Sequence, residues 1–422
     1  MTGRKKWMVR IKRFWGILGP GLVTGASDDD PSGIATYSQA GAGFGLSTLW
    51  TALITFPLMS SIQEMCARIG LVTSHGLTGT LKRNYSRSLL YAMVLFSFPP
   101  IVFNIGADIA GMGAVANMLA PRIHAAYFSL GFTAVLLVAI IYLPYQKIAS
   151  VLKYLCAFLL VYLIVPFLSK QDWMAVIKAT FIPTIKFNKD FILILVAILG
   201  TTISPYLFFW QATMEAEDSK HKKRHLVVDK SLIHKMNMDV DFGMFFSTLV
   251  MFFVMLTTGT VLFNGGIHQI DTVEQAAKAL EPLAGKGAYF LFAAGVIGTG
   301  FLAIPVLSGS LSYIISETFE WEAGLDKKFH EAKPFYIVVA LSLILGLSIN
   351  YIGISPIKAL IYTATLYGIT SPIIIAIVLH ISNNKKVMGD YTNGRWANIL
   401  GITTFTLMTI SVLFLLYTQL FN

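Results

Sequence analysis

The chain has 422 residues, of which 55% are hydrophobic and only 13% are charged, and its mean hydropathy is +0.67. Such usage excludes an ordinary soluble globular domain and predicts an integral membrane protein. The net charge of +10 does not indicate a nucleic-acid partner, because the basic residues are spread over separate loops beside apolar runs and form no single basic face.

Apolar runs long enough to cross a bilayer, roughly 20 residues each, recur along the whole chain. We separate about eleven of them, give or take one. The first follows a basic stretch, but it is too long for a signal peptide and has no small-residue cleavage site, so we expect it to be retained. The runs fall near 14–44, 46–70, 89–119, 123–143, 147–169, 191–216, 238–264, 286–317, 334–354, 356–381 and 397–420.

The loops between these runs differ in charge. If the amino terminus is cytoplasmic, most of the 32 Lys and Arg residues lie in cytoplasmic segments, as the positive-inside rule requires. An odd number of spans then places the carboxyl terminus outside. We expect a multi-pass protein of a bacterial-type cytoplasmic membrane, surrounded by the lipid bilayer and without an obligatory protein partner. The basic segments include Arg4–Arg13, Lys82–Arg87, Lys220–Lys235, Lys327–Lys333 and Lys385–Arg395.

The two cysteines, Cys66 and Cys156, lie within apolar runs and have no CxxC or Cys/His cluster near them. This pattern predicts neither a disulfide framework nor a thiolate metal site, and we expect no resident cofactor. No linker is long enough to separate domains, so residues 1–422 are predicted to form a single membrane domain.

Two of the runs are interrupted in a comparable way. The first contains Ser27 to Gly33, and the sixth contains Gly200 to Tyr206. The proline in each segment removes a backbone donor and clashes with the preceding turn, so each span should break there. Interrupted spans at corresponding places in two halves of a chain indicate an inverted-repeat transporter with its binding site at the breaks. The freed carbonyls cannot face lipid, and they suit a bound cation.

Three consecutive carboxylates, Asp28, Asp29 and Asp30, lie at the first break. Each costs at least a few kcal/mol if it is left unpaired in the bilayer, so each needs a cation, water or a basic partner. Successive helical residues point about 100° apart, so at most one or two can share a site. We expect Asp30, beside Pro31, to be the direct ligand, with the other two lining the approach. Alternatively, the acids face a water interface or pair with a basic residue such as Arg68.

Several motifs carry a resemblance to a known family. Gly19-Pro20-Gly21, Asp30-Pro31 and Ala35-Thr36-x-x-Gln39-Ala40-Gly41-Ala42 resemble the pattern GPG…DPGNFAT…QAGA, and Ala67–Thr73 and Asp108–Ala110 also resemble signatures of the same family. That family is the natural-resistance-associated macrophage protein (Nramp) divalent-metal transporters. The resemblance covers most of the chain. It implies an all-α LeuT-type fold of two inverted five-helix repeats, near 14–169 and 191–381, with an additional helix near 397–420, working by alternating access.

The departures from the family pattern concern its metal ligands. In the family, the Asp and Asn of DPGN and the Met of a sixth-span MPHN motif bind a transition metal, helped by backbone carbonyls at the breaks. Here Asp30 keeps the Asp, Gly33 replaces the Asn, and Ser204-Pro205-Tyr206-Leu207 replaces MPHN. Loss of the thioether favours a hard cation, as in the Nramp-related magnesium transporters. The expected metal-site residues are Asp30, Ser204, Asp29 and Gly33, with the backbone carbonyls of Ser27 and Thr201.

The positions that the family uses for proton movement are also altered. The carboxylate of its third-span DLAE motif and the His of MPHN correspond here to Gly111 and Tyr206. We therefore expect transport of Mg²⁺, with Mn²⁺ as a second candidate, and without proton coupling. Asp108 remains where the family has its third-span Asp, and a structural and a functional role for it are equally open.

Other functions stay open at this point. They are a proton-coupled Mn²⁺/Fe²⁺ transporter, a LeuT-type transporter of an organic cation, and a receptor that has lost transport. The chain has no GxSxG or HExxH motif, so we do not expect an enzyme. Ser204 could bond only to its own backbone one turn back. The hydroxyls of Thr363, Thr365 and Thr370 could bond to water around the ion.

Overall fold

The computed structural model describes residues 19–143, 157–169, 171–221 and 228–421. Within these ranges the regular structure is helical and contains no strand. In chain order the helices are α2 (Pro20–Asp28), α3 (Pro31–Phe44), η1 (Gly45–Thr48), α4 (Trp50–Thr73), α5 (Leu77–Asn84), α6 (Arg87–Leu119), α7 (Ala125–Tyr142), η2 (Ala157–Leu160), α9 (Val161–Leu168), α10 (Trp173–Phe181), α11 (Lys189–Thr202), α12 (Pro205–His221), α13 (Lys230–Thr258), η3 (Gly259–Phe263), α14 (Val273–Ala277), η4 (Lys278–Leu280), α15 (Glu281–Ala284), η5 (Gly285–Gly287), α16 (Ala288–Phe319), α17 (Lys333–Ile349), α18 (Pro356–Asn383), α19 (Lys385–Met388), η6 (Gly389–Tyr391) and α20 (Arg395–Phe421).

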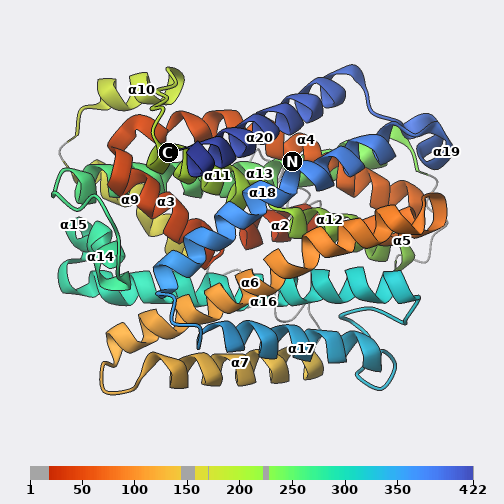
Figure 1. Cartoon of the computed structure of the whole chain (residues 1–422), viewed down its shortest axis with the longest axis horizontal. Coiled ribbons are helices and arrows are strands. Elements are labelled where there is room, and N and C mark those ends of the chain that lie inside the picture. Colours follow the sequence, from red (N-terminus) through yellow and green to blue (C-terminus); the bar gives the residue numbers. More distant parts are fainter. Residues whose placement is uncertain (1–18, 144–156, 170, 222–227, 422) are drawn as a thin grey trace, which may run out of the picture.

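The long helices run along the long axis of the molecule or obliquely to it (Figure 1). Short helices gather at the two ends, with α10, α14 and α15 at one end and α5 and α19 at the other. Each predicted apolar run contains helix wherever the structure describes it. Residues 14–18 and 147–156 of the first and fifth runs, and with them Cys156, lie outside the described residues.

The number of membrane spans depends on how broken and short helices are counted. Among the described residues, length and composition mark seven helices as able to cross a membrane, or eight if Pro31–Thr48 and Trp50–Thr73, bent by 109°, form one span. The total of about eleven stays a prediction. A length criterion misses broken or short helices, such as α2 with 9 residues and α17 with 17.

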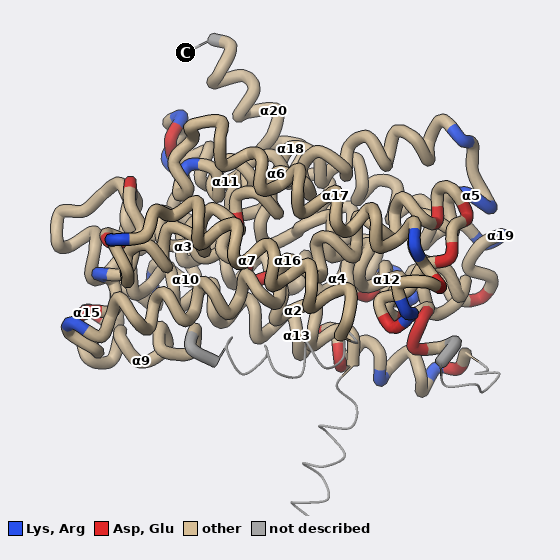
Figure 2. Tube along the Cα trace, turned by 90° about the horizontal axis from the view of Figure 1, so that it is seen from below, with Lys and Arg blue, Asp and Glu red and all other residues tan. Residues whose placement is uncertain are grey.

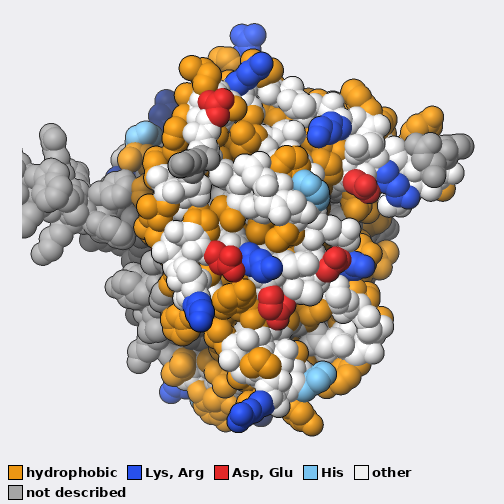
Figure 3. Space-filling view, turned by 90° about the vertical axis from the view of Figure 1, so that its left-hand side faces the viewer, with side chains coloured by type: hydrophobic (Ala, Val, Ile, Leu, Met, Phe, Trp, Pro, Cys, Tyr) orange, Lys and Arg blue, Asp and Glu red, His pale blue; other side chains and the backbone are white. Residues whose placement is uncertain are grey.

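Charged residues concentrate toward the two ends of the molecule, and few lie along its middle (Figure 2). At the end that carries α10, α14 and α15, side chains of both signs are scattered among hydrophobic ones (Figure 3). Between the ends, large apolar side chains such as Leu95, Val138 and Leu413 are more than half exposed. An apolar belt between two polar ends is what a bilayer requires of a protein that spans it.

Glycine contacts hold the broken helices against their neighbours. Helix α2 crosses α13 so closely that a Cβ at Gly25 would lie 2.1 Å from the carbonyl oxygen of Gly243. Helix α11 crosses α18 in the same way, since a Cβ at Gly200 would lie 2.1 Å from the carbonyl oxygen of Ala364. Small residues allow membrane helices to approach at backbone distance. Each broken span therefore rests directly on the backbone of a long helix.

We predict that Gly25→Val destabilises the protein by about 1–3 kcal/mol or more, because the new side chain would meet backbone that cannot move aside. The measurement is thermal unfolding of the purified chain in detergent. Gly131→Val in α7 is the matched control, since a Cβ at Gly131 meets nothing within 4 Å. Equal unfolding temperatures for the two variants would contradict the close crossing of α2 and α13.

Candidate cation site

The first helix break lies between α2 and α3. Helix α2 ends at Asp28 and α3 begins at Pro31, while Asp30 is extended, with φ −69° and ψ 171°. The residue before a proline is disfavoured in the helical region, and proline itself is well suited to a first helical position. The carboxylate of Asp30 caps the new helix by accepting the amide of Gly33 at 2.7 Å. The break predicted from the sequence is thus present, with Asp30 at its centre.

The second helix break lies between Thr202, where α11 ends, and Pro205, where α12 begins. The hydroxyl of Ser204 donates to the carbonyls of Thr201 (2.6 Å) and Gly200 (3.0 Å). This is the local bond to the preceding turn that the sequence left open as an alternative. The hydroxyl oxygen keeps its acceptor capacity in that arrangement, so the bond does not remove Ser204 as a ligand.

The two breaks are joined by one hydrogen bond. The hydroxyl of Tyr206 donates to the carbonyl of Ser27 at 2.9 Å. Ser27 lies four residues before Pro31, and Thr201 lies four residues before Pro205, so each carbonyl has lost its helical partner to a proline that has no amide. Hydroxyls on either side of Pro205 satisfy both of them. The two carbonyls predicted to face the ion are therefore held by the second break.

Four carboxyl groups are buried around the first break, with exposed fractions of 0% for Asp28, 1% for Asp29, 2% for Asp30 and 0% for Asp108. Ser247 of α13 donates to Asp28 at 2.5 Å and approaches Asp29 at 3.5 Å. These two acids therefore face α13. No ion pair to any of the four acids is found within the part of the chain that the structure describes.

The other two acids lie toward α6. Asn104 donates its amide to the second oxygen of Asp30 at 3.0 Å. Asp108 lies one turn further along α6, and neither of its oxygens receives a side-chain hydrogen bond from the described residues. Arg68, the basic residue considered as a partner for these acids, instead donates to Asn393 at 2.8 Å.

The predicted site residues thus fall into two groups at the two breaks. Asp30, Gly33, Asp29 and Ser27 belong to the first, and Ser204 and Thr201 belong to the second. The described residues contain no group of three or more His, Cys, Asp or Glu side chains placed to hold a metal ion.

Sequence reasoning missed two donors, Asn104 and Ser247. Asn104 could have been found, because it lies one helical turn before Asp108 in an otherwise apolar run and must share its face. Ser247 gave no such signal, since its partners are far away in the sequence. The hydroxyls of Thr363, Thr365 and Thr370 donate to carbonyls of their own helix, so a role with water around the ion stays a prediction.

The start of α2 is held by Asp239 of α13. Its carboxylate accepts the amides of Gly19 (2.7 Å), Gly21 (2.7 Å) and Leu22 (3.3 Å). Pro20, between them, has no amide to satisfy, and α2 has no side-chain cap of its own. A Cβ at Gly21 would lie 2.8 Å from this carboxylate. The Gly19-Pro20-Gly21 motif therefore fits a helix start that is capped from outside.

Comparison with known proteins gives one family and one fold. The family model "Nramp: Natural resistance-associated macrophage protein-like" matches residues 21–418. A divalent metal cation transporter MntH of Caldanaerobacter subterraneus is 25% identical over 425 residues, covering 98% of this chain and 95% of that protein. A MntH of Klebsiella pneumoniae is 24% identical over 391 residues, covering 91% and 90%.

Solved structures show the same architecture. A crystal structure of a manganese transporter from Eremococcus coleocola superposes with a TM-score of 0.74 at 18% identity, covering 95% of this chain and 86% of that chain. Mhp1, a nucleobase-cation-symport-1 family transporter in a closed conformation, superposes with a TM-score of 0.53 at 12% identity, covering 95% and 93%. At these identities the likeness shows the fold alone, and it confirms the LeuT-type fold expected from the motifs.

We predict that Ser247→Ala lowers the stability of the protein by about 1–3 kcal/mol, because the buried carboxyl of Asp28 loses its hydrogen-bond donor. Thermal unfolding at neutral pH measures the change. The control is Ser342→Ala in α17, a buried serine whose hydroxyl donates only to the carbonyl of Val339 in its own helix. If both variants unfold at the same temperature, Ser247 does not support the acids.

Proposed function

The chain belongs to the Nramp family of natural resistance-associated macrophage protein-like proteins, and on that premise we propose that it carries divalent metal cations across a membrane by alternating access. The proposal is supported by curated relatives named as divalent metal cation transporters and by the fold shared with a manganese transporter. The observation that carries it is the pair of joined helix breaks beside buried carboxyl groups. The relatives are named as transporters, and we assign no catalytic activity.

In this proposal Asp30 is the anionic ligand of the transported cation. Its carboxylate lies at the break, where backbone carbonyls of Ser27 and Thr201 have been freed by the two prolines. A carbonyl oxygen has two lone pairs, so each can keep its hydroxyl donor and still coordinate a cation. Ser204 adds a hydroxyl oxygen, and Gly33 brings no side chain where the family has an Asn; a Cβ there would lie 3.5 Å from a carboxylate oxygen of Asp30. Asp29 adds negative charge at the approach.

We further propose that the transported cation is a hard ion, with Mg²⁺ ahead of Mn²⁺. Every ligand assigned above is an oxygen atom, and oxygen sites suit Mg²⁺, whereas the thioether of the family's MPHN motif favours transition metals. Mg²⁺ retains several of its waters when it is bound through one or two carboxylates. The small residues at Gly33 and Ser204 suit an ion that keeps part of its hydration shell.

We propose that transport proceeds without proton coupling. The position of the family's third-span carboxylate is Gly111, where a Cβ would lie 3.1 Å from a methyl group of Leu360, so its surroundings are apolar. Tyr206, at the position of the family's His, is engaged with the carbonyl of Ser27. A second candidate, a proton-coupled Mn²⁺/Fe²⁺ transporter, is favoured by Asp108, a buried carboxyl that receives no side-chain hydrogen bond from the described residues. An organic cation as the cargo would be revealed by competition with metal uptake.

We predict that Asp30→Ala lowers divalent-metal uptake into proteoliposomes to about a tenth of wild type or less, because the charged ligand is lost. It should also cost about 1 kcal/mol of stability through loss of the helix cap. Asp30→Asn separates these effects, since Asn still caps the helix and carries no charge. Asp390→Ala, in the short η6 turn, is the control for loss of an acid elsewhere. Wild-type uptake by both Asp30 variants would exclude Asp30 as the ligand.

We predict that proteoliposomes under a negative-inside potential take up Mg²⁺ without internal acidification. Mg²⁺ and Mn²⁺ are offered separately, and an internal pH dye is read in parallel. Gly111→Glu alone should not create acidification, because the new carboxyl would enter apolar packing against Leu360. Uptake of Mn²⁺ only, together with acidification, would support the proton-coupled alternative and overturn the hard-cation assignment.

A further inference from the structure

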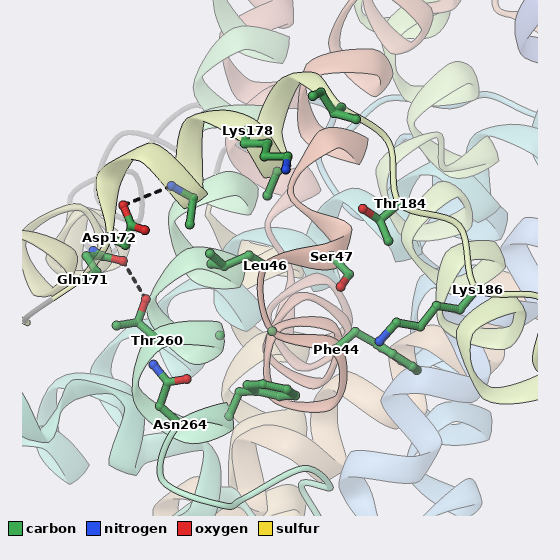
Figure 4. Close-up of a pocket in the computed structure, with 16 residues that line it drawn as sticks. Phe44, Leu46, Ser47, Gln171, Asp172, Lys178, Thr184, Lys186, Thr260 and Asn264 are labelled. Atoms are coloured by element: carbon green, nitrogen blue, oxygen red, sulfur yellow. Dashed lines mark hydrogen bonds between the residues drawn. The ribbon is translucent and has the colours of Figure 1, made fainter.

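A cavity of about 550 Å³ lies at the end of the molecule that carries α10, away from the candidate cation site. Figure 4 shows it between three parts of the chain: the end of α3 with η1, helix α10 with the segment that leads to α11, and η3. All three are connections that the charge distribution of the sequence places on the outer side. None of its lining residues belongs to the proposed cation site.

Two lysines give this cavity a positive charge. Lys178 comes from the last turn of α10 and Lys186 from the chain that leads to α11, and both side chains extend toward the cavity (Figure 4). The Lys186 ammonium lies 5.8 Å from the ring centroid of Phe44. Among the described lining residues the one acid is Asp172, whose carboxylate accepts the amides of Met174 and Ala175 at the start of α10.

The rest of the lining combines hydrogen-bonding groups with apolar walls. Ser47 and Thr184 supply hydroxyls, and Asn264 supplies an amide. Gln171 is already engaged, since it donates to Pro166 and accepts from Thr260. The apolar part of the wall includes Phe44, Leu46, Ile182 and Phe263. A bare metal cation would be repelled by such a lining, whereas an anion attached to an apolar group would fit it.

Helix α10 indicates where the cavity lies relative to a membrane. Its exposed apolar residues are Trp173 (41%), Met174 (71%), Ile177 (53%) and Phe181 (67%). At 100° per residue these four fall within one sector of about 100° on the helix surface. An exposed apolar face that includes a tryptophan is typical of segments at the membrane interface, where tryptophan is enriched. The cavity behind α10 is then at the level of the lipid headgroups.

We propose that this cavity binds the phosphate headgroup of an anionic glycerophospholipid from the leaflet in which α10 lies. Lys178 and Lys186 neutralise the phosphate, Ser47 and Thr184 donate hydrogen bonds to its oxygens, and the apolar wall accepts the glycerol backbone and the first acyl carbons. The exposed face of α10 continues this wall into the hydrocarbon. A free phosphate ion would use the lysines alone and would leave the apolar wall without an occupant.

The test is native mass spectrometry of the full chain in detergent with added phosphatidylglycerol, or with phosphatidylcholine of the same acyl chains. We expect preferential binding of phosphatidylglycerol and a loss of roughly thirtyfold in affinity for Lys178→Gln/Lys186→Gln, since each lysine near a charged lipid surface contributes about 1 kcal/mol. Lys278→Gln/Lys286→Gln is the matched control, because it removes the same charge from exposed positions in the connection between η3 and α16.

Three results would overturn the proposal. The first is equal phosphatidylglycerol binding by Lys178→Gln/Lys186→Gln and by the control pair. The second is equal binding of the two lipids by the wild-type chain. The third is displacement of the lipid by millimolar inorganic phosphate, which would make the cavity a site for a free anion. Thermal unfolding without lipid should be the same for both lysine pairs and for wild type, which ensures that a loss of binding is not a loss of fold.

Discussion

A proline inside a membrane helix deprives the carbonyl one turn before it of its partner, and an apolar interior requires that carbonyl to be satisfied. At the centre of this protein, two such carbonyls are satisfied at one place. Ser27 precedes Pro31 and Thr201 precedes Pro205, and both carbonyls are bonded by hydroxyls next to the second proline. The second break satisfies its own freed carbonyl through Ser204, whereas the first break depends on Tyr206 of the second.

The same constraint explains the arrangement of the acids. An unpaired carboxylate in a bilayer is costly. The four buried acids do not gather at one point, because two of them lie toward α13 and two lie toward α6. Asp28 and Asp29 face Ser247 of α13, while Asp30 faces Asn104 of α6. Asp29 and Asp30 both lie between α2 and α3, but only Asp30 caps α3. Asp30 therefore differs from Asp28 and Asp29 in its contacts, although the three acids are adjacent in the sequence.

Much of this arrangement could be predicted from the sequence, because it depends on local rules. Pro31 and Pro205 located the breaks, the length of apolar runs located the helices, and the family motifs indicated the fold. What could not be predicted depends on contacts between distant segments. Nothing local indicates that Tyr206 reaches Ser27, since 179 positions separate them. The bonds that Ser204 makes were foreseen as an alternative, but spacing alone could not decide between them and a bond to an ion.

The cap that Asp239 provides to α2 has a mechanical consequence. Helix α2 has nine residues, a length of about 14 Å, and it is pinned at both ends: to α13 through Asp239 and to α12 through the carbonyl of Ser27. It therefore acts as a short rigid strut between those two helices. Any sliding of α13 relative to α12 must be transmitted along the strut to the Ser27 carbonyl or must break one of its pins. The position of the Ser27 carbonyl at the helix breaks therefore depends on the relative position of α12 and α13.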